Sequence, residues 1–356
     1  MKQRIVLSAL ILIYILSNCG SDKQTLNNFL PNATGTDSEM LIVMDSSKFK
    51  KKLGRSVINV FGENIYGLPQ PEPYFDLKYI RPKNFNNILK FAKNIIIIFT
   101  LEGDSPSSKL LRNEFNQNSI EKIKSDTSLF MMIKKDQYAI GQEILYLFGK
   151  NDQVLLDHIK KNKEKLRTYF ERRVIKKVNK KNISNTNKNI SKDLMKRFGY
   201  NITVPAGFSI AKLDSQFVWL REIDPEIEKN IFIYFENYVS DEIFYKKNIE
   251  DFRRKISLKY LRDVENPSIY MTYQKELPFM KTEVNFKEKF SIETRGLWKL
   301  SDISGGGPFL SYTFVDKNSD KLYYLEGYVY APGSKKRDLM REIYSILWSF
   351  KIKVYK

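Results

Sequence analysis

The chain has 356 residues and a mass of 42.0 kDa, and its 60 Lys and Arg against 41 Asp and Glu give a net charge of +19. Its 42% hydrophobic and 13% aromatic content excludes a disordered or collagen-like chain, and its length corresponds to about two domains. The sequence contains one His and one Cys, which excludes a Cys/His zinc site, an internal disulfide framework and most nucleophilic triads. No metal and no cofactor are therefore predicted.

The N-terminus has the pattern of an export signal. Lys2 and Arg4 precede an apolar run of twelve residues, 5–16, which is too short for a bilayer that needs about 20. The run ends in Leu16-Ser-Asn-Cys-Gly20, which resembles the lipobox of bacterial lipoproteins, although Asn18 stands where Gly or Ala is usual. The resemblance implies cleavage before Cys19 and acylation of its thiol, as with palmitate. Cleavage takes the chain from 356 to 338 residues and its net charge from +19 to +17.

Several acyl chains would hold such a protein stably on a membrane. Gly20 follows the cysteine, where an Asp favours retention in the inner membrane, and Asp22 is the acid near the anchor. We therefore expect a cell-envelope protein on the outer membrane that faces the periplasm. Residues 19–38 are polar and are interpreted as the lipidated cysteine and its tether.

The next segment, residues 39–181, is predicted to be an N-terminal α/β domain: a small sheet covered by helices, with a long basic helix at its end. Strands are expected at 40–44, 75–80, 94–101 and 129–133, and helix from 137 to 181. Residues 160–181 carry eleven Lys and Arg but two Glu. The apolar stripe that predicts the helix consists of Leu155, Ile159, Leu166, Phe170, Val174 and Val178.

A polar linker is expected at residues 182–189, and residues 190–356 are predicted to form a mainly antiparallel C-terminal α+β domain. Helices are expected at 241–261 and 335–347, and a hairpin turn at 315–320. The predicted strands are 201–205, 208–213, 217–222, 231–237, 269–274, 282–286, 290–300, 308–315, 322–329 and 348–353. The opening Val204-Pro-Ala-Gly-Phe208, the meander and the closing Ser349-Phe-Lys-Ile352 resemble the Mog1/PsbP-like α+β sandwich.

A series of short motifs runs in one order over nearly the whole mature length. They are Leu30-Pro-Asn-Ala-Thr-Gly35, Leu41-Ile-Val-Met-Asp45, Pro71-Glu-Pro-Tyr-Phe-Asp-Leu77, Asn94-Ile-Ile-Ile-Ile98, Val204-Pro-Ala-Gly-Phe208, Phe217-Val-Trp-Leu-Arg221, Arg295-Gly-Leu-Trp298, Gly306-Gly-Pro-Phe309 and Gly327-Tyr-Val-Tyr-Ala-Pro332, followed by Lys336-Arg337. Together these motifs resemble a Bacteroidota lipoprotein family of unknown function (domain of unknown function family 4837). The resemblance implies an envelope lipoprotein and implies no activity or catalytic residue.

The densest of these motifs suggests a ligand site at Arg295, Trp298, Gly305, Gly306 and Gly307. Glycine backbone amides and the arginine fork suit an anion, but no Gly-Lys-Ser/Thr follows, so this is not a P-loop. The alternative is a glycine turn between strands, with Arg295 in an internal ion pair to an acid such as Glu293 or Asp302.

The basic helix is the second candidate. Lys176, Lys177, Lys180 and Lys181 suit an anionic lipid or glycan surface, at about 1 kcal/mol per Lys. The alternative is an ordinary solvated face. Nucleic acid is not expected as a partner, because no nucleic-acid motif is present, and His158 is interpreted as an ordinary histidine.

We therefore expect a non-catalytic envelope lipoprotein that binds or assembles a protein partner or an anionic envelope component. The alternative is a carboxylate-dependent hydrolase acting on envelope glycan, in which two facing carboxylates do acid and base work. Its candidate acids are Glu283, Glu293, Asp302, Asp316 and Glu326.

Overall fold

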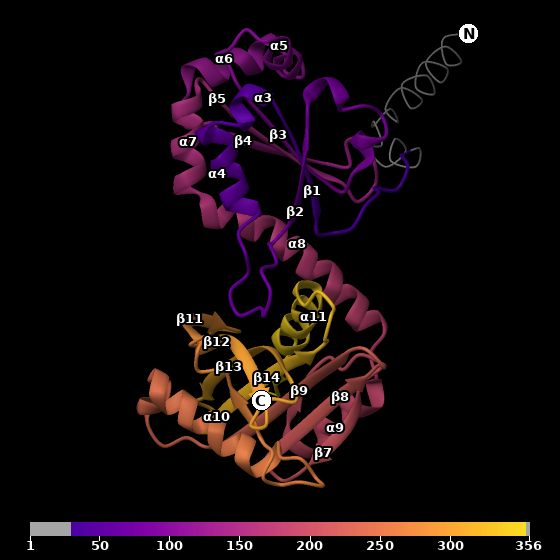
Figure 1. The fold of residues 1–356 in the computed structure, drawn as a ribbon, viewed down its shortest axis with the longest axis vertical. Coiled ribbons are helices and arrows are strands. Elements are labelled where there is room, and N and C mark those ends of the chain that lie inside the picture. Colours follow the sequence, from indigo (N-terminus) through magenta and orange to yellow (C-terminus); the bar gives the residue numbers. More distant parts are fainter. Residues whose placement is uncertain (1–29, 354–356) are drawn as a thin grey trace, which may run out of the picture. The chain divides into compact units, whose positions relative to one another are not determined.

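A computed structural model describes residues 30–353 (Figure 1). The predicted signal, Cys19 and most of the tether therefore lie outside the described residues. The contacts divide the chain into two compact units. Within the described residues, unit 1 comprises residues 30–58 together with Phe75–Asn162, and unit 2 comprises Asn59–Tyr74 together with residues 163–353.

Unit 1 is a five-stranded sheet in the order β2-β1-β3-β5-β4, in which β4 alone is antiparallel to its neighbour. Its strands are β1 (Glu39–Met44), β2 (Asp76–Ile80), β3 (Asn94–Thr100), β4 (Met131–Lys135) and β5 (Glu143–Gly149). Its helices are α3 (Ser46–Phe49), α4 (Lys52–Phe61), which runs on into unit 2, η1 (Pro82–Asn84), η2 (Leu89–Phe91), α5 (Pro106–Arg112), α6 (Gln117–Ser125) and α7 (Asp152–Lys161). Every residue of β3 and β5 is buried, as expected of central parallel strands covered on both faces.

Polar side chains join the carboxyl ends of the central strands of unit 1. Lys48 Nζ donates to Thr100 and to Asp152, each at 2.5 Å. Burial raises the pKa of Asp45, but hydrogen bonds from Ser105, Ser47 and Ser108 outweigh it and hold this pKa at about 2. Lys48 pairs with Asp152, and the Asp45 carboxylate accepts hydrogen bonds from serines, so we interpret these contacts as the element that joins β1, β3 and β5 at this edge.

Unit 2 is built on an antiparallel sheet in the order β10-β12-β13-β14-β9-β8-β7, with β11 also paired to β12. Its strands are β7 (Ser209–Leu213), β8 (Phe217–Ile223), β9 (Glu228–Asn237), β10 (Met271–Tyr273), β11 (Met280–Phe286), β12 (Lys289–Leu300), β13 (Gly306–Asp316) and β14 (Lys321–Tyr330). The short strands β6 (Tyr200–Asn201) and β15 (Lys351–Ile352) pair separately. The helices are α8 (Lys163–Ser184), α9 (Lys188–Phe198), η3 (Asp241–Phe244), α10 (Lys246–Tyr260) and α11 (Arg337–Trp348).

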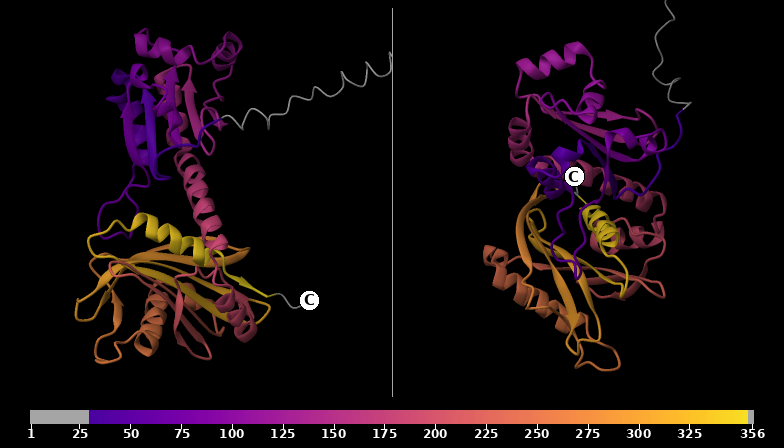
Figure 2. Two further views of the ribbon diagram at one scale, coloured as in Figure 1. Left: turned by 90° about the vertical axis from the view of Figure 1, so that its right-hand side faces the viewer. Right: turned by 45° about the horizontal axis from the view of Figure 1, so that its top comes forward.

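Helices cover both faces of this sheet. The buried side chains of α11 pack with those of one face, and the buried side chains of α10 pack with those of the other. Figure 2 shows α11, in yellow, and α10, in orange, on opposite sides of the sheet. The prediction of an α+β protein, with a small helix-covered N-terminal sheet and a mainly antiparallel C-terminal sandwich, is confirmed.

The loop between α4 and β2 belongs to unit 2. The carboxylate of Glu72 accepts hydrogen bonds from the backbone N–H groups of Lys336 and Arg337, at 2.7 and 3.0 Å, where α11 begins. A carboxylate suits this place because the first N–H groups of a helix lack partners within the helix. Arg337 also donates to the carbonyl oxygen of Pro73.

The prediction of continuous helix over 137–181 is wrong. Residues 143–149 form the central strand β5, and α7 and α8 are separate helices that meet at Asn162. A short apolar run such as Glu-Ile-Leu-Tyr-Leu-Phe-Gly is compatible with a buried strand or a buried helix. Pairing with its neighbours decides that residues 143–149 form a strand. Of these neighbours, β3 is remote in the sequence and β4 is weakly patterned.

The predicted linker 182–189 contains the end of α8 and the start of α9. In the contact division, α8 lies in unit 2, whereas the sequence-based division placed residues 163–181 with the N-terminal domain. The reason is packing: the Glu171 carboxylate of α8 pairs with Arg341 of α11 at 2.6 Å, and Phe170 packs edge-on against Phe61.

Candidate functional site

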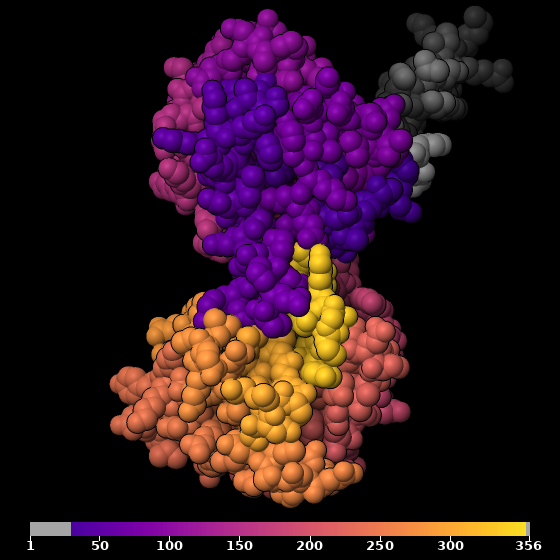
Figure 3. Space-filling view, in the orientation of Figure 1, coloured from indigo at the N-terminus to yellow at the C-terminus, as the bar shows by residue number. Residues whose placement is uncertain are grey.

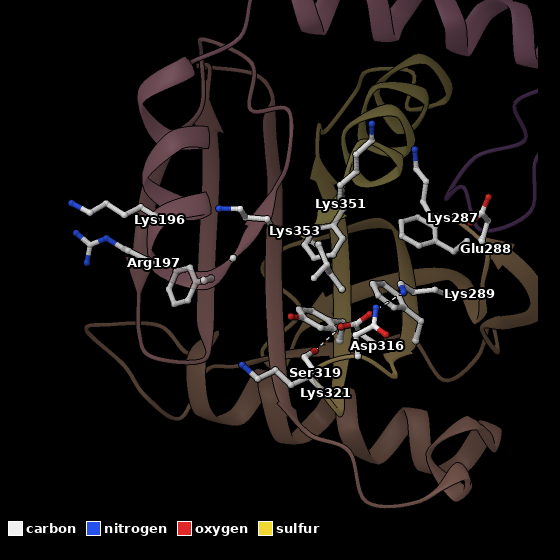
Figure 4. Close-up of a pocket in the computed structure, with 18 residues that line it drawn as sticks. Lys196, Arg197, Lys287, Glu288, Lys289, Asp316, Ser319, Lys321, Lys351 and Lys353 are labelled. Carbon is white, nitrogen blue, oxygen red and sulfur yellow. Dashed lines mark hydrogen bonds and ion pairs between the residues drawn. The ribbon is translucent and has the colours of Figure 1, made fainter. Parts of the chain in front are cut away.

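A basic groove of about 1080 Å³ lies in unit 2, where four chain segments converge (Figure 4). These segments are the end of α9, the β11–β12 turn, the β13–β14 hairpin and the segment around β15. The groove is lined by seven cationic and two acidic side chains: Lys196, Arg197, Lys287, Lys289, Lys321, Lys351 and Lys353, with Glu288 and Asp316. This is a net excess of five positive charges.

Local structure explains how the cations reach the groove. Lys196 and Arg197 occupy the last turn of α9, where the helix dipole favours positive charge, and Gly199 ends the helix with φ +72°. Lys287 and Glu288 form the two-residue turn between β11 and β12. Both have positive φ, at 53° and 67°, as a type I′ hairpin turn requires, although non-glycine residues rarely adopt it.

The charge of the groove is only partly compensated. Lys289 pairs with Asp316 at 2.9 Å, and Arg197 pairs with Asp193 at 2.9 Å. Within residues 30–353, the remaining lysines Lys196, Lys287, Lys321 and Lys351 have no ion-pair partner. Figure 4 shows these cations distributed around the groove rather than gathered at one point.

Two of the uncompensated lysines influence each other. Partial desolvation, followed by the like charge of Lys351, lowers the pKa of Lys287. An anion bound between these two ammonium groups would relieve their repulsion. The aromatic residues Phe286, Phe314 and Phe350 line the groove beneath these lysines, but their side chains are buried. The groove is therefore suited to attracting negative charge rather than to taking up an apolar chain.

The residues of the predicted ligand site around Arg295 do not come together in one place. Arg295 lines a cavity of about 670 Å³ beside α8 and α11, whereas Trp298 and Gly305 line a different cavity of about 430 Å³. Arg295 and Trp298 are three residues apart on β12 and so point to opposite faces of the sheet. This separation could have been inferred from the sequence, because successive side chains of a strand alternate between its two faces.

The internal ion pair that we considered as the alternative for Arg295 is present, with Glu293. Arg295 Nε donates to Glu293 Oε1 at 2.6 Å, and the Tyr312 hydroxyl donates to the other carboxylate oxygen at 2.7 Å. Asp302 is exposed and instead accepts from Ser304 in its own turn.

Gly307 has a packing role. A Cβ on Gly307 would lie 2.0 Å from the carbonyl oxygen of Val329, so only glycine fits there. The Trp298 indole donates to the same oxygen at 3.1 Å. This close approach of β13 and β14 accounts for Gly307 without a bound anion.

Three of the predicted surface lysines, Lys176, Lys180 and Lys181, are exposed along α8, and Lys177 is half-buried. Lys176 also lines the cavity that contains Arg295. His158 stacks on Phe130 at 4.7 Å and makes a hydrogen bond with the carbonyl of Thr127, which agrees with an ordinary structural histidine.

The candidate carboxylates of the hydrolase alternative have other partners or lie apart. Glu326 pairs with buried Arg253, Asp316 with Lys289 and Glu293 with Arg295, while Glu283 is exposed on β11. Among residues 30–353, no group of three or more His, Cys, Asp or Glu side chains is placed to hold a metal ion. In the same range, no helix combines the length and apolar character needed to cross a bilayer.

Sequence reasoning did not identify the basic groove. Its cations come from segments 196–197, 287–289, 321 and 351–353, which are far apart in the chain. A weak signal was present, because Lys351 and Lys353 are two residues apart in the predicted strand 348–353 and would share a side.

Comparison with known families finds a domain of unknown function, DUF4837, at residues 186–349, so this domain is present, but it does not extend over the predicted motifs that precede residue 186. Residues 33–182 match a second domain of unknown function, DUF8532. No curated protein matches the sequence.

Two solved structures of Mog1 are similar to part of this chain. The Ran-binding protein Mog1p of Saccharomyces cerevisiae has 9% sequence identity and a TM-score of 0.29, and the match covers 43% of this chain and 90% of that one. A mutant of protein Mog1 has 10% identity, the same TM-score and the same coverage.

Proposed function

We propose that the protein is a non-catalytic, lipid-anchored envelope protein that binds an anionic envelope component through the basic groove of unit 2. The observation that carries the proposal is the excess of five positive charges around the groove, four of them on lysines that have no ion-pair partner within residues 30–353. Uncompensated cations that surround a concave surface attract anions and raise their local concentration.

The anionic component is expected to carry several charges. A single phosphate would engage the Lys287 and Lys351 pair, whereas the lysines and arginines across the groove suit the head groups of neighbouring anionic lipids or an acidic glycan. Lys176, Lys177, Lys180 and Lys181 on α8 provide a second basic surface that would add to the same attraction.

The proposed place of action is the periplasmic face of the outer membrane, with the protein held through acylated Cys19. This part of the proposal rests on the export signal, the lipobox resemblance and the resemblance to Bacteroidota lipoproteins, all taken from the sequence. A protein partner in the envelope is compatible with the same anchoring. The hydrolase alternative gains no support from the paired or separated carboxylates of unit 2.

The anchor is tested by metabolic labelling. We expect the wild-type protein to incorporate labelled palmitate and Cys19→Ala to incorporate none, because residue 19 is the chain's one cysteine. Labelling that persists in Cys19→Ala would refute lipidation at this residue. Cys19→Ser should behave like Cys19→Ala, since the hydroxyl does not replace the thiol.

The binding function is tested with the chain from Gly20 onward, which lacks the lipidated Cys19, in a vesicle co-sedimentation experiment. We expect binding to vesicles containing phosphatidylglycerol, none to pure phosphatidylcholine, and a loss of affinity as NaCl screens the charges. Polygalacturonate as competitor separates the two sources, since strong competition favours an acidic glycan and weak competition favours lipid head groups. Equal binding to neutral and anionic vesicles would contradict the proposal.

A further inference from the structure

The cavity of about 670 Å³ that contains Arg295 is a second, separate feature of unit 2. The loop before β2, together with α8, β12 and α11, provides its lining. Figure 3 shows the loop, in purple, lying on the orange and yellow surface of unit 2. Hydrogen bonds hold it there, from Tyr66 to the carbonyl of Pro278 and from the N-terminus of α11 to Glu72.

The guanidinium of Arg295 makes only part of the hydrogen bonds that it is able to donate. Its Nε donates to Glu293, while its two terminal nitrogens make no hydrogen bond with any residue in 30–353. These two nitrogens form the planar fork that binds carboxylate or phosphate in a bidentate manner. The fork is therefore available to a ligand in the cavity.

Two tyrosine hydroxyls line the same cavity. Tyr74 and Tyr344 are half-buried, and neither hydroxyl has a hydrogen-bond partner among the described residues. Burial raises the pKa of Tyr74, although the charges of Arg167 and Arg295 oppose it. Burial and Glu293 raise the pKa of Tyr344, against the effect of Arg295. Both hydroxyls therefore stay protonated at neutral pH and are able to donate.

The other charges of the cavity leave a positive excess. Arg167 pairs with Glu63 and Glu164, and Arg341 pairs with Glu171 and Asp338, so these arginines are compensated. Arg172 and Lys176 are exposed at the same cavity and have no ion-pair partner within the described chain.

The cavity also has an apolar part. Ile65, Leu68, Ile175 and Met340 line it, and Tyr344 stacks on Trp348 with ring centroids 5.6 Å apart. A ligand with an apolar or aromatic body and one anionic head would satisfy both the apolar surface and the unused donors.

We propose that this cavity binds a small organic anion, a carboxylate or phosphate monoester with an apolar body, whose oxyanion head is held by Arg295, Tyr74 and Tyr344. The site differs from the basic groove in location and in chemistry: it uses one arginine fork and two neutral donors rather than distributed lysines. It does not depend on the proposed function of the groove.

The test is calorimetric titration of the mature chain with benzoate and with phenyl phosphate, which distinguish a carboxylate from a phosphate head. Benzyl alcohol is the neutral control. We expect one of the two anions to bind at least about 10-fold more tightly than benzyl alcohol, because hydrogen bonds to a charged group are stronger than those to a neutral one. The double variant Tyr74→Phe/Tyr344→Phe should weaken that binding about 10-fold or more, and Arg295→Lys should do so too.

Controls separate this site from the groove and from misfolding. Lys196→Gln/Lys321→Gln alters the groove at two lysines that do not line this cavity and should leave the affinity unchanged. The phenylalanine variant keeps the ring packing, so its thermal unfolding should match that of the wild type even if Arg295→Lys is destabilised. The proposal is overturned if neither anion binds more tightly than benzyl alcohol, if the phenylalanine variant binds equally well, or if the groove variant alone abolishes binding.

Discussion

Replacing Lys196, Lys287, Lys321 and Lys351 together by glutamine is expected to weaken binding to phosphatidylglycerol vesicles by about three orders of magnitude. Each lysine near an anionic surface contributes about 1 kcal/mol, and about 1.4 kcal/mol corresponds to a factor of ten. Since these four lysines have no ion-pair partner within residues 30–353, their removal should cost only the weaker cation–π contacts of Lys287 with Trp348 and Lys321 with Phe235 and the helix-end interaction of Lys196. Removing Lys287 should even relieve its repulsion with Lys351.

A matched control has the same change in net charge on unit 1. Lys50, Lys51, Lys52 and Lys83 are exposed there and lie outside the groove. Their joint replacement by glutamine should weaken binding far less than the groove variant does, in the same co-sedimentation measurement. A third variant, in which Lys176, Lys177, Lys180 and Lys181 are replaced by glutamine, measures how much α8 contributes to vesicle binding. Equal losses in the groove and unit 1 variants would mean that net charge, not the groove, drives binding.

Replacing Glu326 by alanine is expected to lower the free energy of unfolding by about 3–5 kcal/mol, because it leaves the buried charge of Arg253 unpaired. The Glu326 side chain on β14 is 0% exposed and that of Arg253 on α10 is 3% exposed. The two join through hydrogen bonds of 2.7 and 2.8 Å. Burial lowers the pKa of Arg253, but the charge of Glu326 raises it above its ordinary value, so the arginine stays charged.

Urea unfolding followed by tryptophan fluorescence measures this effect. All three tryptophans, Trp219, Trp298 and Trp348, lie in unit 2 and therefore report on its unfolding. Glu283→Ala is the control, since Glu283 is exposed on β11 and forms no ion pair in the described chain. The double variant Arg253→Met/Glu326→Leu should recover much of the loss, because two apolar side chains replace the pair. A loss below about 0.5 kcal/mol in Glu326→Ala would contradict a compensating role for this pair.

Local pattern was sufficient for most of the C-terminal domain. Strands with alternating or continuous apolar residues, such as β9 and β14, are long and bounded by turn residues, and the Val315 to Asp320 hairpin signal coincides with the β13–β14 turn. It failed at β5, where seven buried residues are compatible with either helix or strand until β3 and β4 pair with them.

The candidate sites likewise include contacts that the sequence could predict and contacts that it could not. The internal pair of Arg295 with Glu293 was foreseeable, since two residues apart on a strand share one face. The unused fork of Arg295 and the hydroxyls of Tyr74 and Tyr344 could not be associated from sequence, because residues 74 and 344 are far from 295 in the chain. Only the docking of the loop and of α11 beside β12 brings them to one cavity.

The sequence by itself determined the excess of positive charge, the presence of one cysteine within a lipobox-like motif and the α+β character of the chain. These follow from composition and from short-range periodicity, which need no knowledge of the partners in space. The tertiary structure decided that β5 is a central strand, that Arg295 and Trp298 face different cavities, and that lysines from four segments surround one groove. Each of these depends on pairing and packing between residues that are distant in the chain, and local pattern carries no record of such contacts.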